Sequence, residues 1–477
     1  MRRVFIAAAV AIIAAGAVAG ILVRYPDGIP EIMQRLFSPA EPLSRESWTL
    51  AFYLAGDNSL ERDQLENLRE ICEGSPAVAD TPVVVFIDRD DDISRDSPLT
   101  AWKGSRLFVV TKKDYLDVIR SPIDVDIPRS VEAGRFERSI TARLQDPRDR
   151  DFILEHYEKK GGYYVLGRHG RETGERIRAV LAEKAGYLLP LRGREHANLD
   201  AVDGRTLSRF VRYVKDNFPS ERYLLCIAGH GSGWFGNAAG ILPPAENRSG
   251  EYFRGFEIQG LRQALQDEPV DVLVLDMCSM GDIETAWELK DCTRYLVSNQ
   301  TAVPTMGLDY TLLLRRLGRR QALTPQDIAG DAVEAYRDTY GGFRQFALSA
   351  AALDLGDDFE AFVESFQRAV SDPALLPAIR KAGRDARSIP GRHRSRYPMI
   401  DLLPLAGALG DAELESLSSR RQFMIRHAAV NSELTGISVY LPATAEDRLL
   451  HEYAETSFAR DFPRGWVSVL PGLLADR

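Results

Sequence analysis

The sequence contains few of the residues that build disulfide-rich or zinc-binding proteins. Its 477 residues include four cysteines, at positions 72, 226, 278 and 292, and seven histidines. Such sparse cysteine excludes a disulfide scaffold, although one bridge could form in an oxidising compartment, and the sequence does not say which. There is no C-x-x-C pair and no H-x-x-x-H spacing, so we predict no metal site of the zinc type.

A basic excess is also missing. The 60 basic residues are outnumbered by 69 acidic ones, which gives a net charge of −9 and argues against a nucleic-acid partner. The arginines between Arg380 and Arg396 are interpreted as a solvated face. No internal repeat or low-complexity tract is present. The remaining composition is that of an ordinary globular protein, with ample length for a large core.

One long hydrophobic run stands at the N-terminus. Val4–Val23 contains no charge and no proline, follows Met1-Arg2-Arg3, and is long enough to span a bilayer. Residues 1–24 are therefore either a signal anchor or, with cleavage after Ala17-Val18-Ala19, a signal peptide. Both interpretations place the rest of the chain outside the cytoplasm. If residues 1–24 are an anchor, it lies in the periplasm or at the cell surface; if they are cleaved, it is secreted. Residues 25–46 are predicted to be a linker.

Short apolar runs alternate with helical patterns through the next part of the chain. Strands are predicted over the following ranges: 48–55, 82–87, 107–111, 223–228, 270–275 and 295–298. Helices are predicted over 206–218, 257–266 and 281–289, the first from apolar residues at i, i+3, i+4 and i+7. Continuous apolar strands that alternate with helices predict an α/β protein with a mostly parallel, doubly wound sheet.

Two regions depart from this alternation. Residues 112–198 are charged and weakly periodic, and we predict an insertion there within a core that spans 47–310. Residues 311–477 carry mostly helical patterns, with one late strand over Thr435–Leu441. We therefore expect a largely helical C-terminal part of the same unit.

Two of the apolar runs end in reactive side chains. Tyr223–Ala228 leads into Gly229-His230-Gly231, and Val270–Leu275 leads into Asp276-Met277-Cys278. In α/β sheets, chemistry collects at the carboxyl ends of the strands. If these strands are neighbours, a cysteine nucleophile meets a histidine base there, and the amides of Gly231 and Cys278 are candidate oxyanion donors.

Cys278 differs from the other cysteines in its position. It follows a strand and precedes the helix predicted at 281–289, whose dipole together with a nearby imidazolium would favour the thiolate. Cys226 lies inside a strand and is interpreted as core. Cys72 and Cys292 stand in helical or loop context, and we assign them no catalytic role.

Two other patterns suggest different functions. Gly231–Gly236 matches G-x-G-x-x-G after a strand, but no helical pattern follows, and Trp234 would crowd a pyrophosphate, so we reject nucleotide binding. Asp88, Asp90, Asp91, Asp92 and Asp96 could offer oxygen ligands to calcium, yet they lack the EF-hand spacing and are interpreted as a solvated loop. We predict that no cofactor is required.

Five segments, in this order, resemble the clostripain-like cysteine peptidases, which share a clan with caspases, gingipains and legumain. They are Trp48–Glu61, Thr206–Phe210 with Tyr223–Trp234, Asp276–Gly281 with Glu284, Gln300–Tyr310, and Gly436–Pro442. The resemblance implies a caspase-like three-layer α/β/α sandwich and a cysteine endopeptidase that acts on peptides or proteins. It implies that His230 is the general base and acid, that Cys278 is the nucleophile, and that Gly231 and Cys278 form the oxyanion hole.

The resemblance also concerns specificity. Asp276 stands where the family places an acid that reads the P1 side chain, which implies cleavage after arginine or lysine. The family's P-G-x-G-W segment is altered here, because Met306 stands where a second acid often occurs and Leu308 replaces the tryptophan. Family members also mature by cleavage between the histidine and the cysteine, for which Arg248 is the candidate site.

Two alternatives remain open at this stage. The altered segment at Met306 motivates a catalytically weak or inactive envelope protein that binds peptide or protein partners. A hydrolase or transferase of other acyl groups would use the same dyad, and only a substrate screen separates it from a peptidase.

Overall fold

The computed structural model describes most of the chain after residue 47. The described residues are 48–78, 81–89, 104–110, 130–132, 146–160, 163–166, 173, 176–177, 180, 199–235, 255–343, 347–390, 396–442 and 449–474. The compact unit that carries the sheet spans Trp48–Arg477. Within the described residues, no helix has the length and apolar character needed to cross a membrane. The predicted anchor or signal segment, 4–23, lies outside them.

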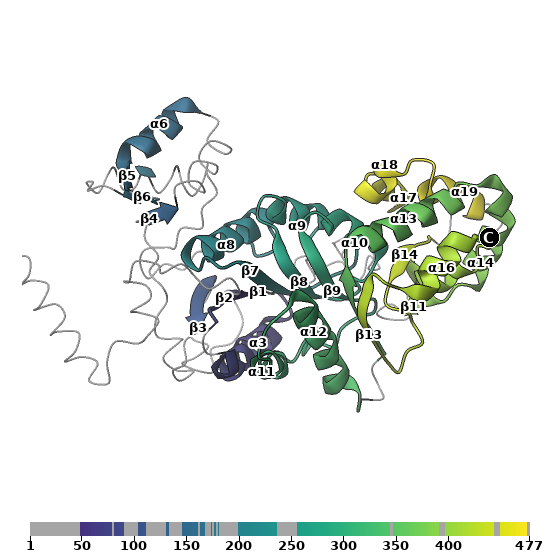
Figure 1. The fold of residues 1–477 in the computed structure, drawn as a ribbon, viewed down its shortest axis with the longest axis horizontal. Helices are drawn as coiled ribbons and strands as arrows, with labels where there is room; N and C mark the ends of the chain where they lie inside the picture. Colours follow the sequence, from purple (N-terminus) through teal and green to yellow (C-terminus); the bar gives the residue numbers. More distant parts are fainter. Residues whose placement is uncertain are drawn as a thin grey trace, which may run out of the picture. The chain divides into compact units, whose positions relative to one another are not determined.

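A mixed sheet of eight strands, in the order β13-β10-β9-β8-β7-β1-β2-β3, is the centre of the unit (Figure 1). Its strands are β1 (Trp48–Gly56), β2 (Val83–Arg89), β3 (Arg106–Val110), β7 (Arg222–Ala228), β8 (Val270–Asp276), β9 (Thr293–Asn299), β10 (Leu348–Asp354) and β13 (Met424–Val430). Strands β2, β1, β7, β8 and β9 pair in parallel, whereas β3, β10 and β13 extend the sheet through antiparallel pairs. The predicted mostly parallel α/β fold is confirmed.

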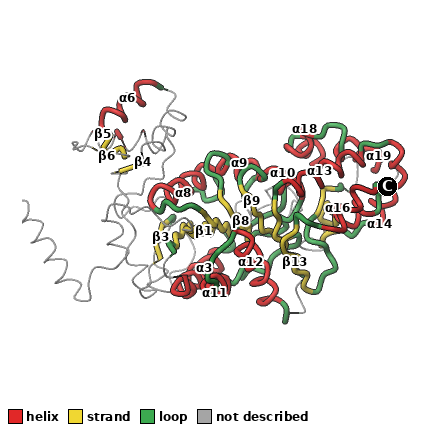
Figure 2. Tube along the Cα trace, viewed as in Figure 1, coloured by secondary structure: helices red, strands yellow, loops and turns green. Residues whose placement is uncertain are grey.

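Helices cover both faces of this sheet (Figures 1 and 2). One face packs against α8 (Gly204–Asn217), α9 (Ile258–Leu265) and α10 (Ile283–Leu289), and the other against α3 (Glu61–Gly74), α11 (Tyr310–Gly318) and α12 (Pro325–Tyr340). Each central strand supplies both cores: in β1, for example, Tyr53 belongs to the first and Phe52 to the second. Apolar side chains on both faces explain the uninterrupted apolar runs in the sequence.

Residues after 311 contain more strands than the sequence indicates. Besides β10 and β13, a three-stranded sheet forms from β11 (Ser388–Pro390), β12 (Arg396–Asp401) and β14 (Ser438–Tyr440). Besides α11 and α12, the helices of this part are α13 (Asp357–Val370), α14 (Leu376–Asp385), α15 (Leu402–Gly407), α16 (Ala412–Arg420), α17 (Leu449–Ala454), α18 (Ser457–Asp461) and α19 (Trp466–Leu474), with the short 3-10 helix η5 (Pro373–Leu375) between α13 and α14. Another 3-10 helix, η1 (Ser75–Val78), follows α3. The part is largely helical, as predicted, and two of its strands complete the main sheet.

The described pieces of the predicted insertion form a small sheet of their own. It consists of β4 (Ser130–Glu132), β6 (Tyr163–Leu166) and β5 (Tyr157–Lys160), all antiparallel, and α6 (Pro147–His156) precedes β5. Asp146 caps α6 by accepting a hydrogen bond from the Arg148 amide.

Candidate active site

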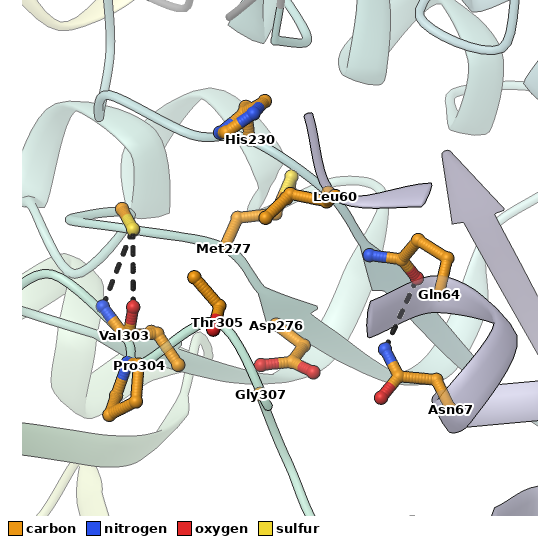
Figure 3. A pocket seen from close by; sticks show the side chains of 12 residues that line it. Leu60, Gln64, Asn67, His230, Asp276, Met277, Val303, Pro304, Thr305 and Gly307 are labelled. Carbon is orange, nitrogen blue, oxygen red and sulfur yellow. Dashed lines mark hydrogen bonds between the residues drawn. The ribbon is translucent and has the colours of Figure 1, made fainter. Parts of the chain in front are cut away.

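Strands β7 and β8 are neighbours and bring His230 and Cys278 to the same edge of the sheet. Ala228 of β7 pairs in parallel register with Asp276 of β8, and each reactive residue follows its strand residue by two positions. Neighbouring strands lie about 4.8 Å apart. Both residues line one open hollow (Figure 3).

The glycines beside His230 allow the two loops to approach closely. The Gly229 amide donates to the Asp276 carbonyl at 3.4 Å. A Cβ on Gly231 would lie 2.7 Å from the Met277 Cβ and 2.8 Å from the Cys278 carbonyl oxygen. Real Cβ atoms do not approach neighbours so closely, so this contact requires glycine.

Cys278 is half-buried, and its thiol lies against the segment that follows β9. The Val303 amide donates to Sγ at 3.4 Å, and Sγ–H donates to the Val303 carbonyl at 3.7 Å, the two bonds drawn beside Val303 in Figure 3. Ser279, the next residue, has a left-handed backbone with φ of 58°.

The helix predicted at 281–289 is present, but it begins two residues later than predicted, farther from Cys278. Helix α10 starts at Ile283, and Asp282 caps it by accepting from the Thr285 amide at 2.7 Å. The dipole effect is confined to the first turn of a helix, and here a carboxyl group already occupies that end. The Val303 amide is the hydrogen-bond donor to the sulfur instead.

His230 is 6% exposed, and its Nε2 lies 2.8 Å from the Ser59 hydroxyl. Ser59 belongs to the turn after β1, where the Asn58 side chain accepts from the Leu60 amide and donates to the Ala55 carbonyl. The sequence indicates Asn58 or Ser59 as a helix cap. In the structure Leu60 occupies the cap position of α3 without a side-chain bond, and Ser59 contacts the histidine.

The other three cysteines are buried, and all four thiols are free. Burial raises the pKa of Cys72 and of Cys292 to about 12, and it raises the pKa of Cys226 well above its ordinary value. These thiols are therefore unreactive core groups, which agrees with the roles predicted for them.

Asp276 lines the hollow and is only 5% exposed. Its Oδ2 accepts from the Leu308 amide and the Tyr310 hydroxyl, both at 2.9 Å, and its Oδ1 accepts from the Tyr336 hydroxyl at 2.6 Å. Burial raises the pKa of Asp276, and these three hydrogen bonds oppose the rise. A Cβ on Gly307 would lie 2.4 Å from Oδ2, so the chain at that point must also be glycine.

Helix α3 lines the hollow with residues that sequence reasoning did not select. Leu60, Gln64 and Asn67 face it at helical spacing. The Asn67 Nδ2 donates to the Gln64 Oε1 at 3.1 Å, and the Asn67 Oδ1 has no hydrogen-bond partner. The signal that could have revealed them is the presence of two amides on the buried face of α3, beside Leu68 and Ile71.

Met306 lies in the loop between Val303 and Gly307 and is 49% exposed. Thr305 and Gly307, on either side of it, line the hollow. The loop is held at its far end by Tyr340, whose hydroxyl donates to the Gly307 carbonyl at 2.6 Å. Met306, predicted to bind substrate, is not among the residues that line the hollow. Its exposed side chain is apolar and carries no charge.

The C-terminal part contacts the loops that carry both reactive residues. Trp234 packs edge-on against Tyr440 and Tyr453, with ring centroids 5.1 and 5.0 Å away. The Glu284 Oε1 accepts from the Tyr440 amide at 2.9 Å and from the Tyr453 hydroxyl at 2.8 Å. Burial raises the pKa of Glu284 to about 7, and the pKa of its neighbour Asp282 is also raised.

Several predicted residues lie outside the described residues, among them Arg248, Asp90, Asp91, Asp92 and Asp96. Of the acidic stretch only Asp88 and Arg89 are described. The Asp88 carboxylate accepts from the Ser105 hydroxyl at 2.5 Å, and burial raises its pKa to about 7. Arg89 forms a buried ion pair with Glu61 at 2.6 Å. Among described side chains no cluster of three or more histidines, cysteines or carboxylates could hold a metal ion.

Comparison with known proteins adds to this geometry. A family model described as the Clostripain family matches residues 52–374, more than half of the chain. No curated protein matches the chain.

Two solved structures share the fold. One, an inactive zymogen of a C11 protease from Parabacteroides distasonis, aligns with a TM-score of 0.55 and 16% identity over 88% of this chain and 99% of that one. The other, a secreted C11 cysteine protease from Bacteroides thetaiotaomicron bound to an irreversible peptide inhibitor, aligns with a TM-score of 0.54 and 14% identity over 87% and 98%.

Proposed function

We propose catalytic roles for Cys278 and His230 in this chain, which belongs to the clostripain family of cysteine peptidases. Cys278 is the nucleophile, and His230 is the general base and acid. The observation that carries the proposal is the parallel register of Ala228 with Asp276, which sets the two residues at matching positions beyond adjacent strands. A cysteine and a histidine on one hollow are the groups that acyl transfer by a thiolate needs.

The proposed reaction begins when His230 takes the thiol proton of Cys278. The hydrogen bond from the Val303 amide to Sγ supports the resulting thiolate. Sulfur then attacks the peptide carbonyl carbon, and the oxyanion is stabilised by the amides of Gly231 and Cys278. His230 returns its proton to the departing amine, the C–N bond breaks, and water hydrolyses the thioester to free the acid and the thiol.

Variants of the two residues test this mechanism. Cys278→Ala and His230→Ala should each lower kcat/KM on peptide amides by roughly 10³-fold or more, while Cys292→Ala, a buried thiol away from the hollow, should leave it within about twofold. Turnover of peptides by Cys278→Ala at the wild-type rate would exclude the dyad. Turnover of esters with no turnover of peptides would favour a different acyl-group hydrolase.

The substrate preference is proposed to be a basic P1 residue. Asp276 supplies a carboxylate to the hollow, and Met306, exposed on the neighbouring loop, supplies no second charge. A peptide panel that varies only P1 tests this: lysine or arginine should be favoured over leucine and glutamate. Asp276→Asn should remove that preference while the protein remains folded.

Self-cleavage at Arg248 is proposed as a maturation step, because a basic residue there would fit the proposed P1 preference. The wild-type protein should give a second N-terminus at Ser249, and both Cys278→Ala and Arg248→Ala should remain intact. A cut in the Cys278→Ala protein would assign the cleavage to another enzyme.

We further propose that residues 4–23 either anchor the protein in a membrane or direct its export, so that the catalytic body works outside the cytoplasm. Fractionation distinguishes the two. An anchored protein sediments with membranes and retains Met1 or Arg2, whereas an exported one is soluble outside the cytoplasm and begins near Gly20.

A further inference from the structure

The carboxylate of Asp276 has little free capacity to bind a substrate. A carboxylate offers about four lone-pair positions, two on each oxygen. Both positions on Oδ2 are taken, by the Leu308 amide and the Tyr310 hydroxyl, and one on Oδ1 is taken by Tyr336. Only one direction on Oδ1 is left for a ligand.

A second acceptor lines the same hollow. Asn67 is 2% exposed, and its Oδ1 has no hydrogen-bond partner although Nδ2 is bound to Gln64. Asn67 and Asp276 line the same hollow, and in the view of Figure 3 both side chains lie below that of Gln64. Leaving a buried acceptor unpaired is unfavourable, so a ligand that donates to Oδ1 gains binding energy from it.

We infer that Asn67 Oδ1 and Asp276 Oδ1 together bind the ammonium group of a P1 lysine, and that the enzyme selects lysine over arginine. This inference rests on the proposed basic P1 preference and makes it narrower. An ammonium is a compact charge with three donors, and it can bond two single oxygens that belong to different residues.

Arginine fits the same acceptors poorly. A guanidinium binds a carboxylate best through two parallel N–H bonds, one to each oxygen. Oδ2 of Asp276 has no lone pair left for the second bond. Some of the five guanidinium donors would therefore stay unpaired in the pocket, which lowers affinity for arginine relative to lysine.

The walls of the hollow suit the rest of a lysine side chain. Leu60 and Met277 line it above the polar end, and Val303 and Pro304 line the opposite side. Such side chains contact the methylene stem of a lysine while its charged end reaches the acceptors. Asn67 would then be a specificity residue in contact with the substrate.

Paired substrates test the selectivity directly. Two fluorogenic peptides are compared that differ only in having lysine or arginine at P1. Their kcat/KM should differ by about tenfold or more in favour of lysine, because the acceptors of the site are arranged for an ammonium and leave donors of a guanidinium unpaired. Asn67→Leu removes the acceptor at similar volume. It should lower turnover of the lysine peptide by about tenfold and change the arginine peptide by less than about threefold.

A second variant should shift the selectivity toward arginine. Asn67→Asp replaces the amide by a carboxylate whose two oxygens can accept a guanidinium fork, so the arginine-to-lysine ratio should rise above that of the wild type. Glu66→Gln is the matched control, because Glu66 lies on the exposed face of α3 and pairs with Arg69. It should leave the ratio unchanged. Thermal unfolding checks that each variant is folded. A merely structural role for Asn67 would lower the turnover of the lysine and arginine peptides together.

Specific outcomes overturn the inference. Equal turnover of the two wild-type peptides, preference for arginine, or an equal fall for both in Asn67→Leu each contradict it while leaving the basic P1 preference intact. If the wild-type enzyme cleaves peptides with other P1 residues but neither basic one, the proposed preference fails together with this inference. A Cys278 that reacts with no peptidyl ketone and cleaves no peptide contradicts the proposed dyad itself.

Discussion

Gly231 lies so close to Met277 that a Cβ on the glycine would be 2.7 Å from the methionine Cβ. The loop that carries His230 therefore rests directly on the loop that carries Cys278. The space beside Gly231 is filled by Met277, the Cys278 carbonyl and Met280, so the relative placement of the two loops depends on this residue having no side chain.

Gly231→Ala should disturb this placement. The added methyl group also meets the Cys278 carbonyl, so the loops must separate by several tenths of an ångström. We expect a loss of stability of about 1–3 kcal/mol from overpacking and a fall in kcat/KM of roughly 10- to 100-fold from misplaced reacting groups. Peptide hydrolysis and thermal unfolding measure the two effects.

Gly330→Ala is the matched control for that substitution. A Cβ on Gly330 meets nothing within 4 Å, and the residue lies inside helix α12. It should stabilise the protein by roughly 0.5–1 kcal/mol and leave activity unchanged. Equal activity of the Gly231→Ala and Gly330→Ala proteins would contradict the close approach.

Native alkylation should modify one cysteine. Cys278 is half-buried at the hollow, whereas the other three thiols are buried in the core. Brief treatment with iodoacetamide should add one group to the folded wild-type protein, none to Cys278→Ala, and four to the unfolded wild type. Mass spectrometry of the intact protein counts them. More than one adduct on the folded protein would show that a second thiol is accessible.

Ser59→Ala should weaken the support of His230. The variant removes the hydroxyl that lies 2.8 Å from Nε2 and leaves the backbone turn intact. We expect kcat to fall by about 3- to 30-fold, together with a shift of the pH–rate profile on its acidic side. Ser59→Thr keeps a hydroxyl and should retain most of the activity. An unchanged pH profile in the alanine variant would separate Ser59 from the catalytic proton transfer.

Stability should fall as pH rises through the titration of Glu284. Burial keeps its pKa at about 7 in the folded protein, against an ordinary value of 4.5. The folded state therefore binds more protons between these values, and the stabilisation present below about pH 4.5 is lost by about pH 7. The buried carboxyl of Asp282, whose pKa is also raised, lies beside Glu284, so the loss of stability belongs to the two groups together.

Glu284→Gln removes that titration while its Oε1 still accepts from Tyr440 and Tyr453. Its unfolding free energy, measured in urea at several pH values, should fall less than that of the wild type between pH 4.5 and 7. Glu413→Gln is the control, since Glu413 pairs with Arg368 on the surface. Parallel curves for wild type and Glu284→Gln would refute the assignment.

The central strands were predictable because of their two-sided burial. Short runs rich in β-branched residues, such as Val270–Leu275, favour a buried strand over a helix, and the order of runs and helices indicates the parallel sheet. Strand β10 was missed because its sequence, Leu-Ser-Ala-Ala-Ala-Leu-Asp, is rich in alanine, which favours helix. Pairing with β9 and β13 overrides that local preference.

Part of the candidate site could be predicted from the sequence equally well. His230, between two glycines, and Cys278 each follow the end of a strand. The pairing of those strands, β7 and β8, then brings the two residues to the same edge of the sheet. Asn67 and Ser59 could not be assigned from the sequence, because their roles depend on how α3 and the preceding turn pack against β7 and β8. The hydrogen bonds that occupy Asp276 come from Tyr310 and Tyr336, which only tertiary packing places there.

The strand order has a consequence for a chain that has been cut. The four strands β7, β1, β2 and β3 come from the sequence before His230, and β8, β9, β10 and β13 come from the sequence after it. A break anywhere between residues 235 and 255 would therefore create a two-chain enzyme whose subunit boundary runs through the sheet at the β7–β8 pair and between α3 and α11 on one face. One subunit would hold the histidine and the other the cysteine, so neither could act after dissociation, and activity would report directly on the affinity between the two halves.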